Sequence, residues 1–91
     1  MIQAASWTLR EEVQFDKEHV TSRDWNTYPI FRFEEIPELD VEVIDMVKED
    51  PLGAGEAAQG PTAAAITNAI FNATGKRVRD LPVNSAEKYL R

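Results

Sequence analysis

The stretch PLGAGEAAQGPTAAAITNAIFNATG, residues 51–75, decides how this chain of 91 residues folds. Pro61 suits the first turn of a helix, because a helix start needs neither its missing N–H nor a free φ angle. A body rich in Ala and Ile follows, and Gly75 is a good residue for the position just after a helix end. The sequence therefore predicts a helix over about residues 61–74. Because its body is so apolar, this helix is expected to be enclosed by other structure on most sides.

A second helix is predicted at the start of the chain. From Ile2 to about Phe15 the apolar residues recur at three- and four-residue steps, which is typical of an amphipathic helix. This helix begins at residue one without a preceding cap, which points to a missing upstream segment.

Strand patterns lie between the two predicted helices. Residues 41–47 alternate apolar and acidic side chains, as a half-buried strand does, and Pro51 ends the pattern. The aromatic segment 27–33 is expected to be an extended edge segment, a short strand is expected over 78–83, and a final helical turn over 84–91. The expected fold class is α+β, with two main helices (about 2–15 and 61–74) packed on a small sheet.

Length and charge limit what the chain can be. At 91 residues it is at most one domain with a thin core, and a cleft for a large organic cofactor normally needs more layers. We therefore expect residues 1–91 to be a single partial domain. Residues 34–50 hold eight acidic residues and one basic residue, whereas residues 76–91 hold five basic and two acidic. Such an uneven distribution of charge usually means only that these segments face solvent.

Composition excludes several classes of partner. Lys and Arg number 10 against 16 Asp and Glu, a net charge of −6, so nucleic acid is not an expected partner. The chain has no cysteine, which excludes disulfides and thiolate-bound zinc or iron–sulfur clusters. No apolar run approaches the roughly 20 residues of a membrane span, and the start lacks the pattern of a signal peptide. We expect a cytoplasmic chain with no membrane partner.

The glycine-rich loop ahead of the predicted helix is the one candidate for chemistry. Its spacing does not match a phosphate-binding loop, and Glu56 would put a negative charge where phosphates would lie. Glycines let a ligand approach the backbone closely and can take positive φ, so the loop presents a carboxylate among small residues. Glu56 is thus a candidate general base. The alternative is that Glu56 only helps to cap the following helix. His19, the only histidine, is assigned no role, and no residue is assigned as a metal ligand.

The motif GAGEAAQGPTAAAITNAIFNATGKRVRDLPV, from Gly53 onward, resembles the carboxy-terminal part of the molybdenum-binding subunit of the xanthine dehydrogenase and aldehyde oxidase family. The segments IQAASWTLREEV and WNTYPIFRF are similar to the helix and substrate-side loop that precede it in that family. The AAQGP variant most resembles the isoquinoline 1-oxidoreductase and bacterial aldehyde dehydrogenase branch. The resemblance thus implies that the chain is a fragment, the carboxy-terminal part, of a molybdopterin-binding domain.

The resemblance implies a role for each loop residue. Glu56 would be the general base of an oxidoreductase that hydroxylates aldehydes or N-heterocycles with oxygen from water. Ala54 and Gly55, and more weakly Gln59, would bind the cofactor, which is molybdopterin with molybdenum, in the cytosine dinucleotide form. The family's upstream cofactor motifs are absent, so the isolated chain is expected to be inactive and to bind no cofactor.

The resemblance also implies partners. These are the remaining part of the molybdenum-binding subunit and an iron–sulfur subunit. In isolation the faces that they would cover are exposed, so we expect a homodimer. The alternative from another class is a small acidic α+β protein-interaction module without catalysis.

Overall fold

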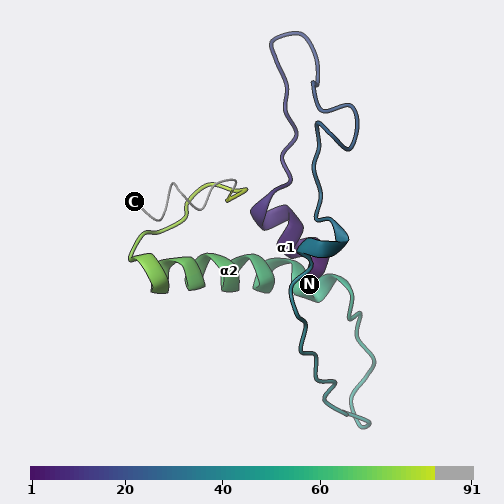
Figure 1. The fold of residues 1–91 in the computed structure, drawn as a ribbon. Coiled ribbons are helices and arrows are strands. Elements are labelled where there is room, and N and C mark those ends of the chain that lie inside the picture. The colour runs from purple at the N-terminus through teal and green to yellow at the C-terminus, as the bar shows by residue number, and fades with distance from the viewer. Residues whose placement is uncertain (84–91) are drawn as a thin grey trace.

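The computed structural model describes residues 1–83, which form two α-helices and two single turns of 3-10 helix (Figure 1). Helix α1 spans Ile2–Leu9 and helix α2 spans Gln59–Thr74. The 3-10 turns are η1, Phe33–Glu35, and η2, Glu56–Ala58. The final turn predicted over residues 84–91 lies outside the described residues.

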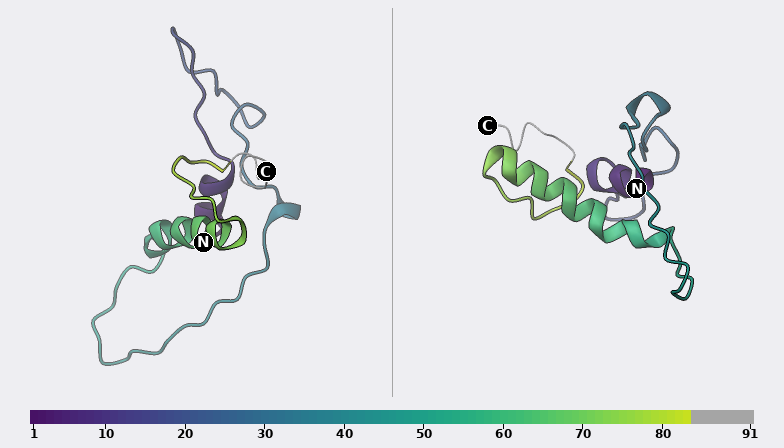
Figure 2. Two further views of the ribbon diagram at one scale, coloured as in Figure 1. Left: turned by 90° about the vertical axis from the view of Figure 1, so that its left-hand side faces the viewer. Right: turned by 90° about the horizontal axis from the view of Figure 1, so that it is seen from below.

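The two α-helices form a small hub, in which α1 crosses the first half of α2 (Figures 1 and 2). The segment after α2 runs back to α1, where the Val83 N–H donates to the Thr8 carbonyl at 2.8 Å. This places α1 at the centre of the core. The buried side chains are few and mostly small: Ala4, Ala5, Ser6, Thr8 and Val83.

Helix α2 ends as the sequence predicts. Gly75 takes the left-handed conformation, with φ 71°, and its N–H donates to the Phe71 carbonyl at 2.7 Å. Only glycine adopts this geometry without steric cost, so the chain turns sharply there. The helix begins at Gln59 rather than at Pro61, because η2 leads directly into it.

Two long arms leave the hub in different directions (Figures 1 and 2). The first arm, residues 10–32, doubles back on itself and holds one antiparallel bridge, between Phe15 and Val20. The second arm, residues 36–55, joins η1 to η2 as an open loop. Nearly all residues of both arms are exposed or half-buried.

The first helix is shorter than predicted. It ends at Leu9, and Arg10 leaves the helical conformation with φ −137°. The predicted apolar stripe of Ile2, Ala5, Leu9 and Val13 fails beyond that point, since Val13 is exposed, and so is Phe15. Their β-branched and aromatic side chains gain nothing from a helix there, and Phe15 joins the bridge of the first arm.

The predicted α+β fold is wrong: residues 1–83 contain no β-strand, and the two helices pack on each other instead of on a sheet. Residues 41–47 carry a strand-like pattern but remain in the second arm. Residues 78–83 return to α1 without forming a strand. A strand exists only when a neighbouring strand pairs with its backbone groups, and in the described part of the chain none lies beside either segment.

None of the helices in residues 1–83 is long and apolar enough to cross a membrane.

Candidate functional site

The predicted catalytic residue lies at the junction of the second arm and α2. Glu56 is the first residue of η2, and it is exposed. Gly55 before it already has helical angles, with φ −67° and ψ −52°. Within the described residues neither η2 nor α2 begins with a side-chain cap hydrogen bond. Glu56 therefore does not cap α2 through a hydrogen bond, although its charge lies near the positive end of the helix.

The glycines of this loop differ from the expectation for a strained turn. Among the described glycines, which are Gly53, Gly55, Gly60 and Gly75, only Gly75 has a positive φ. At Gly53, Gly55 and Gly60 an added Cβ would meet nothing within 4 Å. Thus neither backbone conformation nor packing within residues 1–83 requires glycine at these three positions. Their small size leaves open space beside Glu56.

The other predicted binding residues share this exposed position. Ala54, Gly55 and Gln59 are all exposed, on the same short segment as Glu56. The loop therefore presents a carboxylate and a row of small residues outward from the start of α2. Among residues 1–83 no three His, Cys, Asp or Glu side chains come together as metal ligands.

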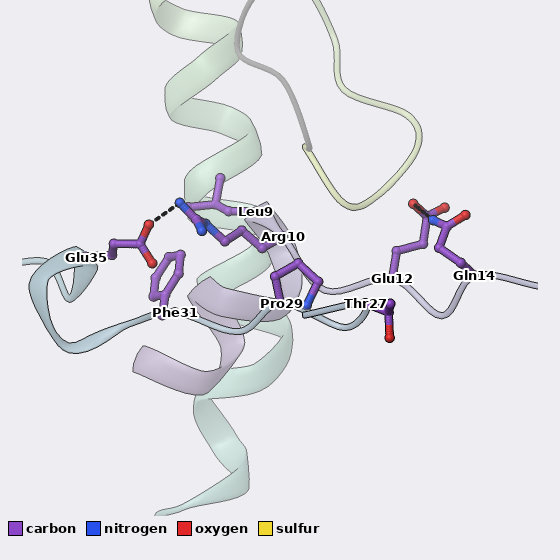
Figure 3. A pocket seen from close by; sticks show the side chains of 8 residues that line it. All are labelled: Leu9, Arg10, Glu12, Gln14, Thr27, Pro29, Phe31 and Glu35. Carbon is purple, nitrogen blue, oxygen red and sulfur yellow. Dashed lines mark hydrogen bonds and ion pairs between the residues drawn. The ribbon is translucent and has the colours of Figure 1, made fainter. Parts of the chain in front are cut away.

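A hollow of about 660 Å³ lies elsewhere, between the end of α1 and the first arm (Figure 3). Arg10 forms a hydrogen-bonded ion pair with Glu35 across it, and the Arg10 Cζ lies 5.9 Å from the centre of the Phe31 ring. At its other end the Gln14 amide donates to the Glu12 carboxylate at 2.7 Å. The hollow is lined by Leu9, Arg10, Glu12, Gln14, Thr27, Pro29, Phe31 and Glu35.

A second, more apolar hollow of about 470 Å³ lies against α1. It brings together Trp25, Tyr28 and Phe31, three of the four aromatic residues of the segment that resembles a substrate-side loop. The Tyr28 hydroxyl donates to the Glu11 carboxylate at 2.9 Å, and this hydrogen bond raises the pKa of Tyr28 above its ordinary value of 10.0. The lining residues are Ile2, Gln3, Ser6, Glu11, Trp25, Tyr28, Ile30 and Phe31.

Glu56 and its neighbours line neither of these two hollows. The side-chain pairs that shape the hollows were not predicted from the sequence, because the two members of each pair are far apart in it. Arg10 and Glu35 are 25 residues apart, as are Ser6 and Phe31. No local spacing signals such a pair.

The chain is similar, along nearly its whole length, to short segments of dehydrogenases and oxidoreductases. It is 47% identical over 85 residues to a nicotinate dehydrogenase subunit of Pseudomonas putida, covering 93% of this chain. It is 38% identical to a membrane-bound aldehyde dehydrogenase (pyrroloquinoline-quinone) of Gluconacetobacter polyoxogenes, and 33% identical to the beta subunit of isoquinoline 1-oxidoreductase of Brevundimonas diminuta, covering 92% and 94% of this chain.

These relatives are much longer than the chain, which spans 7% of the first and 11% of each of the other two. Their names include both enzymes of the branch predicted from the AAQGP variant. The chain is therefore related to parts of oxidoreductase enzymes, and the xanthine dehydrogenase family fits the relatives' names. No family model and no solved structure matches it.

Proposed function

We propose that the chain is the carboxy-terminal part of the molybdenum-binding subunit of a hydroxylase of the xanthine dehydrogenase and aldehyde oxidase type. In this role Glu56 is the general base, and the isolated chain is inactive because the rest of the site belongs to other polypeptide. The observation that carries the proposal is the similarity of nearly the whole chain to a small part of three oxidoreductases.

The geometry of the loop supports the assignment of Glu56. A general base must reach the proton it removes, so it must lie on a surface that the reacting group can approach. Glu56 is exposed, and the open positions at Gly53 and Gly55 beside it give that access. The alternative of a protein-interaction module is wrong only in its α+β fold class, since residues 1–83 form no sheet. A non-catalytic fragment remains one outcome of the experiment below.

The residues present fit a bound pterin cofactor. Ala54 and Gly55 are small and exposed, so a flat ring system could lie against their backbone. Gln59, at the start of α2, offers an amide that can donate and accept hydrogen bonds. When bound, the molybdenum cofactor would supply the redox chemistry, and this chain would supply the base and part of the cofactor surface.

One relative's name carries a different cofactor, pyrroloquinoline quinone. The two candidate cofactors differ in composition, so chemical analysis of the purified complex distinguishes them. We expect molybdenum and a pterin in the purified complex. A complex that contains the quinone and no molybdenum would overturn the cofactor assignment.

The role of Glu56 is tested in the complex purified from the native host. Glu56→Gln keeps the shape of the side chain but removes its basicity. We expect turnover to fall by about 10² to 10⁴-fold, the usual contribution of a general base. The molybdenum content should stay unchanged, because Glu56 is not a ligand in the proposed role.

The matched control is Glu18→Gln, which makes the same change at an exposed glutamate of the first arm. It should leave turnover unchanged. If Glu56→Gln also retained full turnover, the chain would be a non-catalytic part of the complex and the assigned role would be lost.

The proposed partners are the rest of the molybdenum-binding subunit and an iron–sulfur subunit. Two of the relatives are themselves named as subunits, which supports partner subunits in general. The predicted homodimer has no comparable support and stays a prediction. Sedimentation of the isolated chain at micromolar concentration tests it, and a monomer at every concentration would contradict it.

A further inference from the structure

The second arm exposes more apolar surface than a free loop normally does. Val43 and Val47 are 87% and 82% exposed, and Leu52 is 90% exposed. Loops that remain in water rarely concentrate such side chains, and contiguous apolar surface usually marks a binding site. The large exposed apolar side chains of this arm are Leu39, Val41, Val43, Ile44, Met46, Val47 and Leu52.

The backbone of the same segment also has few hydrogen-bond partners in residues 1–83. Between η1 and Pro51 the only backbone hydrogen bond within the arm is that from the Glu49 N–H to the Met46 carbonyl, at 2.9 Å. The N–H and C=O groups of residues 41–45 are therefore available, and the turn closed by the Glu49–Met46 hydrogen bond would open for the strand to reach Val47. A run of available N–H and C=O groups is what an exposed sheet edge accepts as an additional strand.

The side-chain pattern puts both apolar and acidic residues on each face of a strand. In a strand successive side chains point to opposite faces. Val41, Val43 and Val47 would share one face with Asp45, and Ile44 and Met46 the other with Glu42. Each face would therefore offer apolar side chains to a covering surface and one carboxylate to a basic side chain.

Charge favours a particular partner. Acidic residues 42 and 45 stand within this segment, and residues 34–50 hold eight acids and one lysine. Pairing two copies of the arm would set these acids against each other, and like charges directly opposite destabilise a sheet. A sheet edge flanked by Lys and Arg is the complementary surface.

We infer that residues 41–47 add as a β-strand to a sheet edge flanked by Lys and Arg in the rest of the subunit, and not to a second copy of this chain. The identity of this partner rests on the proposed function. The relatives are long enough to contain such a sheet edge, since this chain spans only 7 to 11% of each of them. The docked strand would also fix where the loop that carries Glu56 emerges.

Hydrogen exchange measured on the isolated chain and on the native complex tests the inference. In the isolated chain the amides of residues 41–47 should exchange at nearly the rate of an unstructured peptide. In the complex they should exchange at least about 100-fold more slowly, as paired strands do. Equal, fast exchange in both would overturn the inference. Protection of these amides in a homodimer of the isolated chain would overturn the choice of partner.

Two variants test strand pairing and charge separately. Val43→Pro removes one N–H from the proposed ladder and should prevent assembly with the rest of the subunit. Its control is Val13→Pro, at an exposed valine of the first arm. Glu42→Lys should slow association at low salt about tenfold, whereas Glu18→Lys makes the same change in net charge outside the arm and should not. Equal effects of each variant and its control would contradict the inference.

These outcomes separate the inference from the proposed function. If the amides of residues 41–47 are protected but Glu56→Gln keeps full turnover, the docking strand stands and the catalytic role falls. If Glu56→Gln abolishes turnover while these amides exchange freely in the complex, the catalytic role stands and the docking strand falls.

Discussion

Ser6 joins the first arm to α1 through one hydroxyl group. This side chain is buried, and its Oγ accepts a hydrogen bond from the Phe31 N–H at 3.0 Å. In Ser6→Ala the N–H loses its partner, which costs about 1 to 3 kcal/mol when the donor stays out of water. We expect a lower urea midpoint and faster exchange of the Phe31 amide.

The control for Ser6→Ala is Thr67→Ala. The Thr67 hydroxyl only donates to carbonyls of its own helix, Ala63 and Ala64, so its removal leaves no backbone N–H without a partner. A loss of stability as large as that of Ser6→Ala would mean that the link to Phe31 is unimportant.

Asp24 makes the turn over residues 24–27, on the returning part of the first arm, sensitive to pH. The Thr27 backbone N–H and then the Thr27 hydroxyl donate to its carboxylate, and these bonds lower the pKa of Asp24 below its ordinary value of 3.8. Because the pKa of Asp24 is lower in the folded chain, the ionised carboxylate stabilises this turn at pH values above its ordinary pKa of 3.8. The stabilisation is lost as pH falls through the lowered value.

The Asp24 titration can be followed by the NMR shift of its carboxyl carbon. We expect a midpoint below 3.8 in the native chain. Thr27→Val removes the hydroxyl but keeps the backbone N–H, so the midpoint should rise only part of the way to the ordinary value. A native midpoint at or above 3.8 would contradict the role of these hydrogen bonds.

At the scale of the element, two glycines of the α2 region should respond oppositely to alanine. Gly75 has φ 71°, where a side chain is strained, so Gly75→Ala should destabilise the chain by about 1 kcal/mol. Gly60 lies in the first turn of α2 with open space at its Cβ position, so Gly60→Ala should stabilise by about 0.5 kcal/mol. Urea unfolding measures both, and changes of the same sign would contradict the argument.

A helix or strand can be predicted from the sequence when the residues that determine it are close together in the chain. The end of α2 was predicted because Gly75 carries its own reason to stop the helix. The strand over 41–47 was wrong because a strand depends on a partner, and periodicity alone says nothing about where that partner is. The same division applies to the candidate site. Glu56 stood out within one short motif, whereas Arg10 and Glu35 meet only through the fold.

At the scale of the whole molecule, the chain is more open than its length predicts. Its radius of gyration is 16.3 Å and its extents are 53 × 33 × 26 Å. A compact domain of this length has a radius of gyration of about 12 Å. The difference arises from the two arms, which extend away from a hub whose buried side chains lie in α1 and at Val83 (Figure 1).

Such an architecture makes stability depend on the partner. A hub with so small a core can bury little apolar area, and binding by a partner stabilises the folded form by mass action. The complex should therefore unfold at a higher temperature than the isolated chain. Cleavage by a glutamate-specific protease should begin in the second arm of the isolated chain, because exposed extended chain is the preferred substrate. In the complex that arm should resist cleavage while the tip of the first arm is still cut. If the second arm of the isolated chain resisted the protease as well as it does in the complex, it would already be covered without a partner, and the open architecture would not be that of the molecule in solution.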